Sequence, residues 1–209
     1  MQILSNPSDY TSENSVKIWE KVNYETLPEI SKLIRQHKWA FVNRSNSTAP
    51  ITAWAIDIQG MGQVSGRTDE ELVNSMKKNW GRVSKEYPFV PTLWSSIQQL
   101  VPEYCLDLKR VFINGHTYGL GDSIHDDSAV PGITFIYYFN KVWHPEWGGH
   151  TLIYGSKKQI IATIQPQPAR LLAFDARLFH KGEAPNRCCT DLRCTLAFHT
   201  RIRENNNAE

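Results

Sequence analysis

Two histidines and one aspartate in this 209-residue chain have the residue types of a metal centre. His125 and Asp127 are separated by one residue, and residues two apart in a strand point to the same side. His180 follows an apolar run, residues 171–174, and can approach from a distant part of the chain. Two imidazoles and one carboxylate are the ligands of a mononuclear non-haem iron(II) centre, which leaves other coordination positions open. The sequence therefore predicts an iron site at these three residues.

An arginine in the last strand-like segment, Arg193, is a second candidate functional residue. Alternation puts four residues on one face of this segment: Arg193, Thr195, Ala197 and His199. If that face points inward, Arg193 is a buried guanidinium without a local partner, and its planar fork matches the carboxylate of a small acid. The alternative is an exposed strand arginine. Arg187, in the preceding loop, is the rival candidate for binding the same carboxylate.

Helices dominate the first half of the chain, residues 1–105. Capping-box patterns predict helices that begin at Thr26 and Thr68, and a third helix is expected from about Pro91. Short strands are predicted between the first two helices, at residues 39–42 and 54–58. This half is expected to be a mostly helical support with short strands.

Strands dominate the second half, residues 106–203. The β-branched and aromatic runs are residues 110–113, 133–139, 151–154, 160–164, 170–174 and 193–198. Short strands with Gly and Pro turns predict a mainly β fold with supporting helices. We expect a double-stranded β-helix (a jelly-roll, cupin-like core) with the N-terminal helices packed on one face. One domain over residues 1–209 is predicted, with a frayed tail at 204–209.

Charge and composition exclude several partners. The net charge of +2 is too small to indicate nucleic acid or an anionic membrane as a partner. No apolar stretch approaches a membrane span, and the first residues lack the features of a signal peptide. Four cysteines without a CxxC pair are typical of reduced thiols. A cytoplasmic location is therefore expected, and no feature indicates an oligomeric state.

From about Arg110 to His199 the chain resembles the 2-oxoglutarate- and iron(II)-dependent oxygenases, and within them the prolyl-hydroxylase-like branch. The features that carry this resemblance occur in a specific order. They are Tyr118 with Gly119 and Gly121, His125-x-Asp127, residues 133–141, Trp147-Gly148-Gly149 with Thr151, Pro168-x-Arg170 with residues 171–174, His180 and Arg193.

The resemblance implies a role for each matching position. It implies that His125, Asp127 and His180 ligate iron. It also implies that Arg193 binds the distal carboxylate of 2-oxoglutarate. It further implies that Tyr138 donates to the same carboxylate, that Ile136 packs against the co-substrate and that Tyr118 lies in the pocket near the metal. The implied cofactors are Fe(II), 2-oxoglutarate as co-substrate and O2, with ascorbate as a possible addition.

Three departures separate this chain from the family pattern. The interval between Tyr118 and His125 is shorter than in the oxygen-sensing prolyl hydroxylases. The interval between His180 and Arg193 is longer, and it contains Arg187 and a Cys188-Cys189 pair. His199 stands where nucleic-acid demethylases tend to carry a second arginine, which argues against a nucleic-acid substrate.

The implied reaction is hydroxylation of an unactivated C–H bond of an amino acid, free or peptidyl and proline-like, with release of succinate and CO2. The carboxylate of Asp127 favours hydroxylation over halogenation, because halogenating relatives replace this ligand with a small residue. Two alternatives stay open. One uses the same cofactors on a biosynthetic small molecule, by hydroxylation, desaturation or ring formation. The other is a non-catalytic jelly-roll binding module that retains the metal.

Two segments are candidates to border the entrance of a substrate-binding site. The alternative is that both are ordinary surface loops. One is the glycine-containing loop around Gly60, Gly62 and Gly66. The other is the tryptophan-rich turn at residues 143–147.

Overall fold

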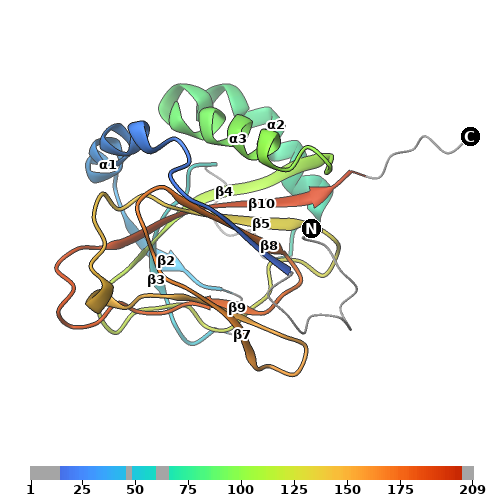
Figure 1. Cartoon of the computed structure of the whole chain (residues 1–209). Helices are drawn as coiled ribbons and strands as arrows, with labels where there is room; N and C mark the ends of the chain where they lie inside the picture. The colour runs from blue at the N-terminus through green and yellow to red at the C-terminus, as the bar shows by residue number, and fades with distance from the viewer. Residues whose placement is uncertain (1–14, 46–48, 60–65, 204–209) are drawn as a thin grey trace, which may run out of the picture.

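Two antiparallel sheets confirm the predicted jelly-roll architecture (Figure 1). The computed structural model describes residues 15–45, 49–59 and 66–203. The large sheet has the strand order β1-β8-β5-β10-β4-β3-β2, and the small sheet has the order β7-β6-β9. The strands are β1 (Val16–Trp19), β2 (Ala40–Asn43), β3 (Ala53–Ile56), β4 (Leu106–His116), β5 (Ile133–Tyr138), β6 (Thr151–Tyr154), β7 (Ile160–Ile164), β8 (Arg170–Asp175), β9 (His180–Gly182) and β10 (Arg193–Ile202).

In the part of the chain that the structure describes, three α-helices lie on the side of the large sheet that is turned away from the small sheet (Figure 1). They are α1 (Leu27–Gln36), α2 (Asp69–Glu86) and α3 (Phe89–Leu100), and short 3-10 turns occur at Tyr24–Thr26 and Pro145–Trp147. Ile30 of α1, Met76 of α2 and Leu93 of α3 share one apolar core with the outer face of the sheet. No helix that the structure describes has the length and apolar character needed to cross a membrane.

Alternation along β10 separates this helix-facing core from the interior between the two sheets. Cys194, Leu196 and Phe198 belong to the core shared with the helices. Arg193 and Thr195 are buried on the opposite side, as the period of two requires. A second apolar cluster fills the interior, with Tyr138 and Phe174 from the large sheet and Ile153 from the small one. The inner face of the large sheet is therefore where the predicted functional residues meet.

Local predictions were accurate for most elements, and the exceptions have identifiable causes. The helix after Thr26 forms, but the Thr26 side chain makes no capping bond, because its hydroxyl donates to the Asn23 carbonyl oxygen. β4 is seven residues longer than predicted, because the polar residues at its ends lie in buried contacts. β1 was not predicted, and it pairs with β8 at the edge of the large sheet. Gly60, Gly62 and the tail at 204–209 lie outside the described residues.

The capping box at the start of α2 offers a test of the helical layer. The Thr68 side chain accepts a hydrogen bond from the Glu71 backbone N–H, and the Glu71 carboxylate accepts one from the Thr68 N–H. We expect Thr68→Ala to lower the free energy of unfolding by about 1 kcal/mol, because the Glu71 backbone N–H loses its acceptor. Urea denaturation measures the change. Thr92→Ala in α3, where the hydroxyl only donates back to the Pro88 carbonyl, is the matched control and is expected to cost less.

Candidate metal centre

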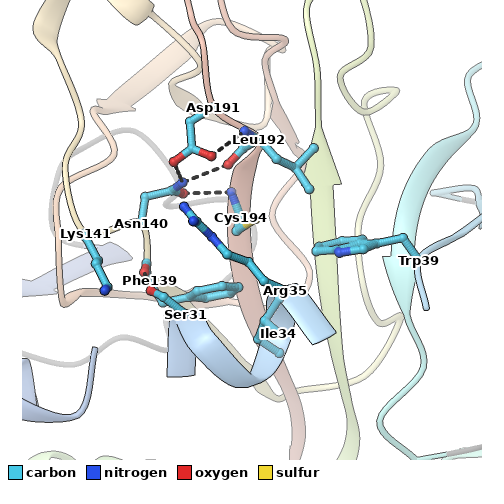
Figure 2. A pocket seen from close by; sticks show the side chains of 10 residues that line it. All are labelled: Ser31, Ile34, Arg35, Trp39, Phe139, Asn140, Lys141, Asp191, Leu192 and Cys194. Carbon is cyan, nitrogen blue, oxygen red and sulfur yellow. Dashed lines mark hydrogen bonds between the residues drawn. The ribbon is translucent and has the colours of Figure 1, made fainter. Parts of the chain in front are cut away.

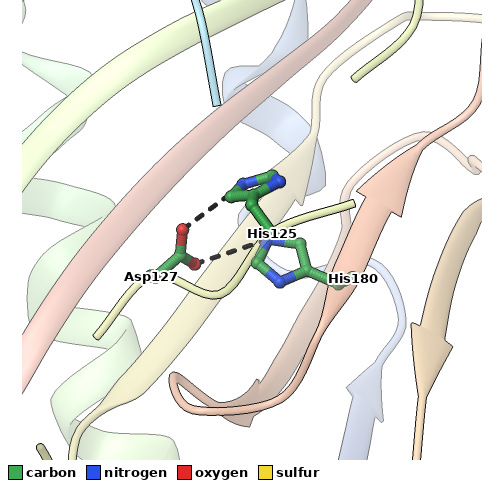
Figure 3. A group of neighbouring side chains, drawn as sticks. All are labelled: His125, Asp127 and His180. Atoms are coloured by element: carbon green, nitrogen blue, oxygen red, sulfur yellow. Dashed lines mark ion pairs between the residues drawn. The ribbon is translucent and has the colours of Figure 1, made fainter. Parts of the chain in front are cut away.

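His125, Asp127 and His180 lie together between the two sheets (Figure 3). Each offers one ligand atom, and these atoms all lie within 4.8 Å of one another. The backbone N–H groups of His125 and His180 each donate to the carbonyl of the other, at 3.0 and 2.8 Å. His125 therefore stands in a single β-bridge beside β9, whereas the sequence predicted a strand for the HxD segment.

Hydrogen bonds fix the orientation of both imidazoles. His125 Nδ1 lies 2.8 Å from the Ser123 carbonyl oxygen, and His180 Nδ1 lies 3.1 Å from the Leu178 carbonyl oxygen. A carbonyl oxygen only accepts, so each Nδ1 carries the proton and each Nε2 presents a lone pair. This is the arrangement of metal-binding histidines, which donate their other ring N–H to a neighbouring acceptor.

The lone pairs of the two imidazoles face a carboxylate. His125 Nε2 lies 3.5 Å from Asp127 Oδ1, and His180 Nε2 lies 3.5 Å from Asp127 Oδ2. Burial lowers the pKa of His180, which keeps this imidazole neutral. Acceptors that converge in this way need a cation between them. The donor set of two histidines and one aspartate, together with its geometry, therefore fits the iron(II) ion predicted from the sequence.

Asp127 is held as a carboxylate by its neighbours. Thr134 of β5 donates a 2.6 Å hydrogen bond to Asp127 Oδ2, and His199 Nε2 of β10 lies 3.4 Å from the same oxygen. Burial raises the pKa of Asp127, but the His199 and His180 imidazoles, which are protonated at the low pH where this carboxyl titrates, outweigh burial together with the Thr134 hydroxyl and hold the pKa well below its usual range. Burial also lowers the pKa of His199 to about 3, so this imidazole is neutral at pH 7.

Arg193 is fully enclosed at the start of β10. Its Nε donates to the Gly149 carbonyl oxygen at 2.5 Å, and its Nη2 donates to the Thr151 hydroxyl at 2.9 Å. Its Nη1 lies 3.2 Å from Nδ1 of His116 in β4. The side chain is 1% exposed, so the predicted inward position is correct and the alternative of an exposed strand arginine is wrong.

A relay of polar groups connects Arg193 to the partly buried carboxylate of Asp122. Because Arg193 can only donate, His116 Nδ1 accepts and His116 Nε2 donates to Asp122 Oδ1 at 3.2 Å. The other oxygen of Asp122 accepts from the Gly182 backbone N–H in β9. Burial raises the pKa of Asp122, but His116 counteracts burial and the net pKa is well below the usual range. Arg193 is therefore connected through the His116 ring to the negative charge of Asp122.

The relay predicts an acid-dependent loss of stability. Asp122 contributes stability above the unfolded carboxyl pKa of about 3.9, and loses it as the pH falls through its lowered folded pKa. We expect Asp122→Asn to lower the free energy of unfolding at pH 7 by about 1–3 kcal/mol. The difference from wild type should shrink below about pH 4, measured by urea denaturation across pH. Asp126→Asn, at an exposed neighbouring carboxylate, should show no such difference.

The remaining residues singled out from the sequence occupy different environments. Tyr138 is buried beside Arg193 and donates to the Thr151 hydroxyl at 2.6 Å, and Ile136 is partly buried in the inner cluster. Tyr118 is 67% exposed, which gives no support to a pocket role. Arg187 is also exposed, in the segment between β9 and β10.

A separate polar cavity of about 90 Å³ lies on the helix-facing side of the sheet (Figure 2). Its lining includes Arg35 from α1, Lys141 and Cys194, and Cys194 points away from the face that bears Arg193. In this cavity Asn140 accepts from the Cys194 N–H and donates to the Leu192 carbonyl oxygen, at 2.8 and 2.7 Å (Figure 2). Asn140 thus fixes the start of β10, and the cavity is distinct from the metal centre.

Sequence reasoning missed His116, Asp122 and Thr134. Extending the alternation of β4 from Arg110 would have placed His116 on the inner face. Nothing in the sequence singles out Asp122 among the acidic residues. Within the tryptophan-rich turn, Pro145–Trp147 form the 3-10 turn. Trp143, which precedes it, is buried and donates to the Gly148 carbonyl oxygen, so this tryptophan is structural.

Comparisons with known proteins agree with this geometry. Residues 113–201 match the family model of the 2OG-Fe(II) oxygenase superfamily, and the matched segment contains all three proposed ligands and Arg193. No curated protein sequence matches the chain. The match confirms the resemblance predicted from the sequence, and with it the cofactors Fe(II), 2-oxoglutarate and O2.

Solved structures share the fold at low sequence identity. A prolyl-4-hydroxylase from Pseudomonas putida is 14% identical with a TM-score of 0.55, covering 90% of this chain and 92% of its own. A Trichoplax adhaerens prolyl hydroxylase, solved with a hypoxia inducible factor peptide fragment, is 16% identical with a TM-score of 0.54, covering 90% and 84%. A 2OG-Fe(II) oxygenase family oxidoreductase from Burkholderia pseudomallei is 12% identical with a TM-score of 0.58, covering 90% and 86%. At these identities the likeness is one of fold.

Proposed function

We propose that this chain, a dioxygenase whose residues 113–201 match the 2OG-Fe(II) oxygenase superfamily, hydroxylates an unactivated C–H bond of an amino acid, free or within a peptide. The products would be the hydroxylated substrate, succinate and CO2. The chain would act as one domain over residues 1–209. The prolyl hydroxylases that share its fold support an amino-acid substrate, and one of them was solved with a peptide.

The observation that carries the proposal is the convergence of three acceptors on one point. His125 and His180 present Nε2 lone pairs because backbone carbonyls hold their Nδ1 protons. Asp127 remains ionised and is oriented by Thr134. When bound there, iron(II) supplies the oxidising chemistry with O2 and 2-oxoglutarate. Asp127 fills the ligand position that halogenation needs open, so hydroxylation is the outcome we propose.

Arg193 has the donors to hold 2-oxoglutarate. A guanidinium has five N–H donors, and Arg193 uses three of them on Gly149, His116 and Thr151. One N–H remains on each Nη, and these two donors can form a bidentate interaction with the two oxygens of a carboxylate. We assign the distal carboxylate of 2-oxoglutarate to these donors. Tyr138 lies against the same guanidinium and shares Thr151 with it, and Ile136 packs against the inner cluster to which Tyr138 belongs.

Two alternatives give different results in the same assays. A small-molecule oxygenase would release succinate with biosynthetic substrates and with no amino acid or peptide. A metal-retaining binding module would bind iron and form no succinate. The enclosed Arg193 favours an enzyme, because a binding module has no need of a second, buried cation beside the metal centre.

The deciding experiment is anaerobic addition of iron(II) and 2-oxoglutarate to the metal-free protein. We expect a weak visible absorption band, followed after admission of O2 by succinate in amounts that rise with a suitable amino acid or peptide. A folded protein that forms no band would overturn the oxygenase assignment. A band with succinate release that no amino acid or peptide increases would point to the small-molecule alternative.

A further inference from the structure

Arg110 carries a second guanidinium on the inner face of the large sheet. In the pairing of β4 with β10 it stands opposite His199, as His116 stands opposite Arg193. Directly opposite residues of an antiparallel pair project from the same face. Because His199 contacts Asp127, Arg110 lies at the metal-centre end of β4, whereas Arg193 lies at the co-substrate end.

An aromatic ring holds this guanidinium in place. The Cζ atom of Arg110 lies 4.1 Å from the centroid of the Phe112 ring, and Phe112 packs edge-on against His199 with centroids 5.0 Å apart. A cation over a ring face is attracted by the ring quadrupole, but the ring supplies no hydrogen-bond acceptor in the guanidinium plane. The donors of Arg110 thus remain available beside the metal centre.

The charge of Arg110 is not neutralised locally. Among residues 15–45, 49–59 and 66–203, Arg110 makes no hydrogen bond and has no carboxylate within ion-pair distance. Burial lowers its pKa, while Asp57 and Asp127 attract it from farther away. The Asp127 charge would be shared with iron in the loaded protein. A partly buried arginine without a partner is uncommon, because removing a charge from water is costly.

We propose that Arg110 binds a carboxylate of the molecule that is hydroxylated. This inference rests on the proposed function and narrows its substrate class to acids. A guanidinium matches a carboxylate in shape, and one positive charge balances one carboxylate charge. The carboxylate could belong to a free amino acid, to the C-terminus of a peptide or to an acidic side chain. A neutral internal peptide segment would leave Arg110 without a partner.

Calorimetry on the anaerobic iron(II)–2-oxoglutarate complex tests this inference without turnover. The probes are free L-amino acids with their carboxamides, short peptides with free or amidated C-termini, and peptides with Asp or Glu in place of Asn or Gln. We expect at least one carboxylate to bind about 10- to 100-fold more tightly than its amide, as for hydrogen bonds to charged groups. The pair of probes that shows the preference identifies whether the carboxylate belongs to a free amino acid, a peptide C-terminus or an acidic side chain.

Two variants complete the experiment. Arg110→Gln should abolish the preference for the carboxylate and leave the affinity for 2-oxoglutarate in the wild-type range, while Arg110→Lys should restore part of the preference. Arg35→Gln, at an exposed guanidinium that lines the separate cavity on the helix-facing side of the sheet, is the matched control and should behave as wild type.

Three results would overturn the inference. They are no carboxylate preference anywhere in the panel, a preference that survives in Arg110→Gln, or a loss of 2-oxoglutarate affinity in that variant equal to the loss for the substrate. If Arg110→Gln fails to fold, the comparison of Arg110→Lys with wild type decides instead. Absence of the iron(II)–2-oxoglutarate band in wild type would count against the proposed function, and calorimetry on metal-free protein would still report on Arg110.

Discussion

Replacing His180 with alanine is expected to abolish the visible band of the iron(II)–2-oxoglutarate complex and all succinate formation. His180 is 4% exposed, and its Nε2 is one of the three converging acceptors. Its removal leaves one imidazole and one carboxylate, which cannot hold one face of an iron octahedron. Loss of a residue that only supports a metal ligand costs about 10- to 100-fold in metal affinity, so loss of the ligand itself should exceed about 100-fold.

The measurements are iron(II) affinity by anaerobic calorimetry and succinate yield on exposure to O2. His144→Ala is the matched control, because His144 is an exposed imidazole in the turn before β6 and should retain both properties. Because removal of a buried ring can disturb packing, circular dichroism and urea denaturation of the metal-free variant must show a folded protein. A folded His180→Ala protein with wild-type iron affinity would exclude His180 as a ligand.

The sequence predicted which side chains meet at the metal centre better than it predicted the backbone that brings them together. Two-residue spacing in a strand predicts that the His125 and Asp127 side chains point to the same side. In the structure this segment is irregular, and His125 is placed by its single β-bridge to His180. Asp127 is held by its N–H bond to the Ala176 carbonyl oxygen. Both partners lie far along the chain from the residues they hold, so no local pattern could reveal them.

Long-range contacts also explain why the relay behind Arg193 was not predicted. His116 acts as an acceptor only because β10 places Arg193 opposite it. Asp122 is kept close to β9 by a reciprocal pair of contacts with the backbone of Gly182. A side chain on Gly182 would collide with the His116 ring and the Asp122 carboxylate, so this glycine is required by a close approach. Alternation within β10, by contrast, is a local property, and it placed Arg193 correctly.

Replacing Arg193 with alanine is expected to raise the Kd for 2-oxoglutarate by about 30-fold or more, while iron(II) still binds. Truncation of one member of a buried, hydrogen-bonded charge pair costs about 2–5 kcal/mol, and about 1.4 kcal/mol is tenfold in affinity. Iron(II) binding should persist because the hydrogen bonds of the Arg193 side chain go to Gly149, His116 and Thr151, and none of these is a proposed iron ligand. Calorimetric titrations of iron(II) and then of 2-oxoglutarate separate the two effects.

Two further variants test separate points. One separates the planar shape of the Arg193 guanidinium from its positive charge, and the other tests Arg187 as the alternative carboxylate-binding residue. Arg193→Lys keeps the charge but loses the planar fork, so it should restore only part of the affinity for 2-oxoglutarate. Arg187→Ala removes an exposed guanidinium and should leave that affinity at the wild-type value. Retained iron binding shows that Arg193→Ala is folded, which guards against loss of affinity through unfolding. If Arg193→Ala binds 2-oxoglutarate as wild type does and Arg187→Ala does not, the carboxylate is held by Arg187, and the segment between β9 and β10 must close over the centre when the co-substrate binds.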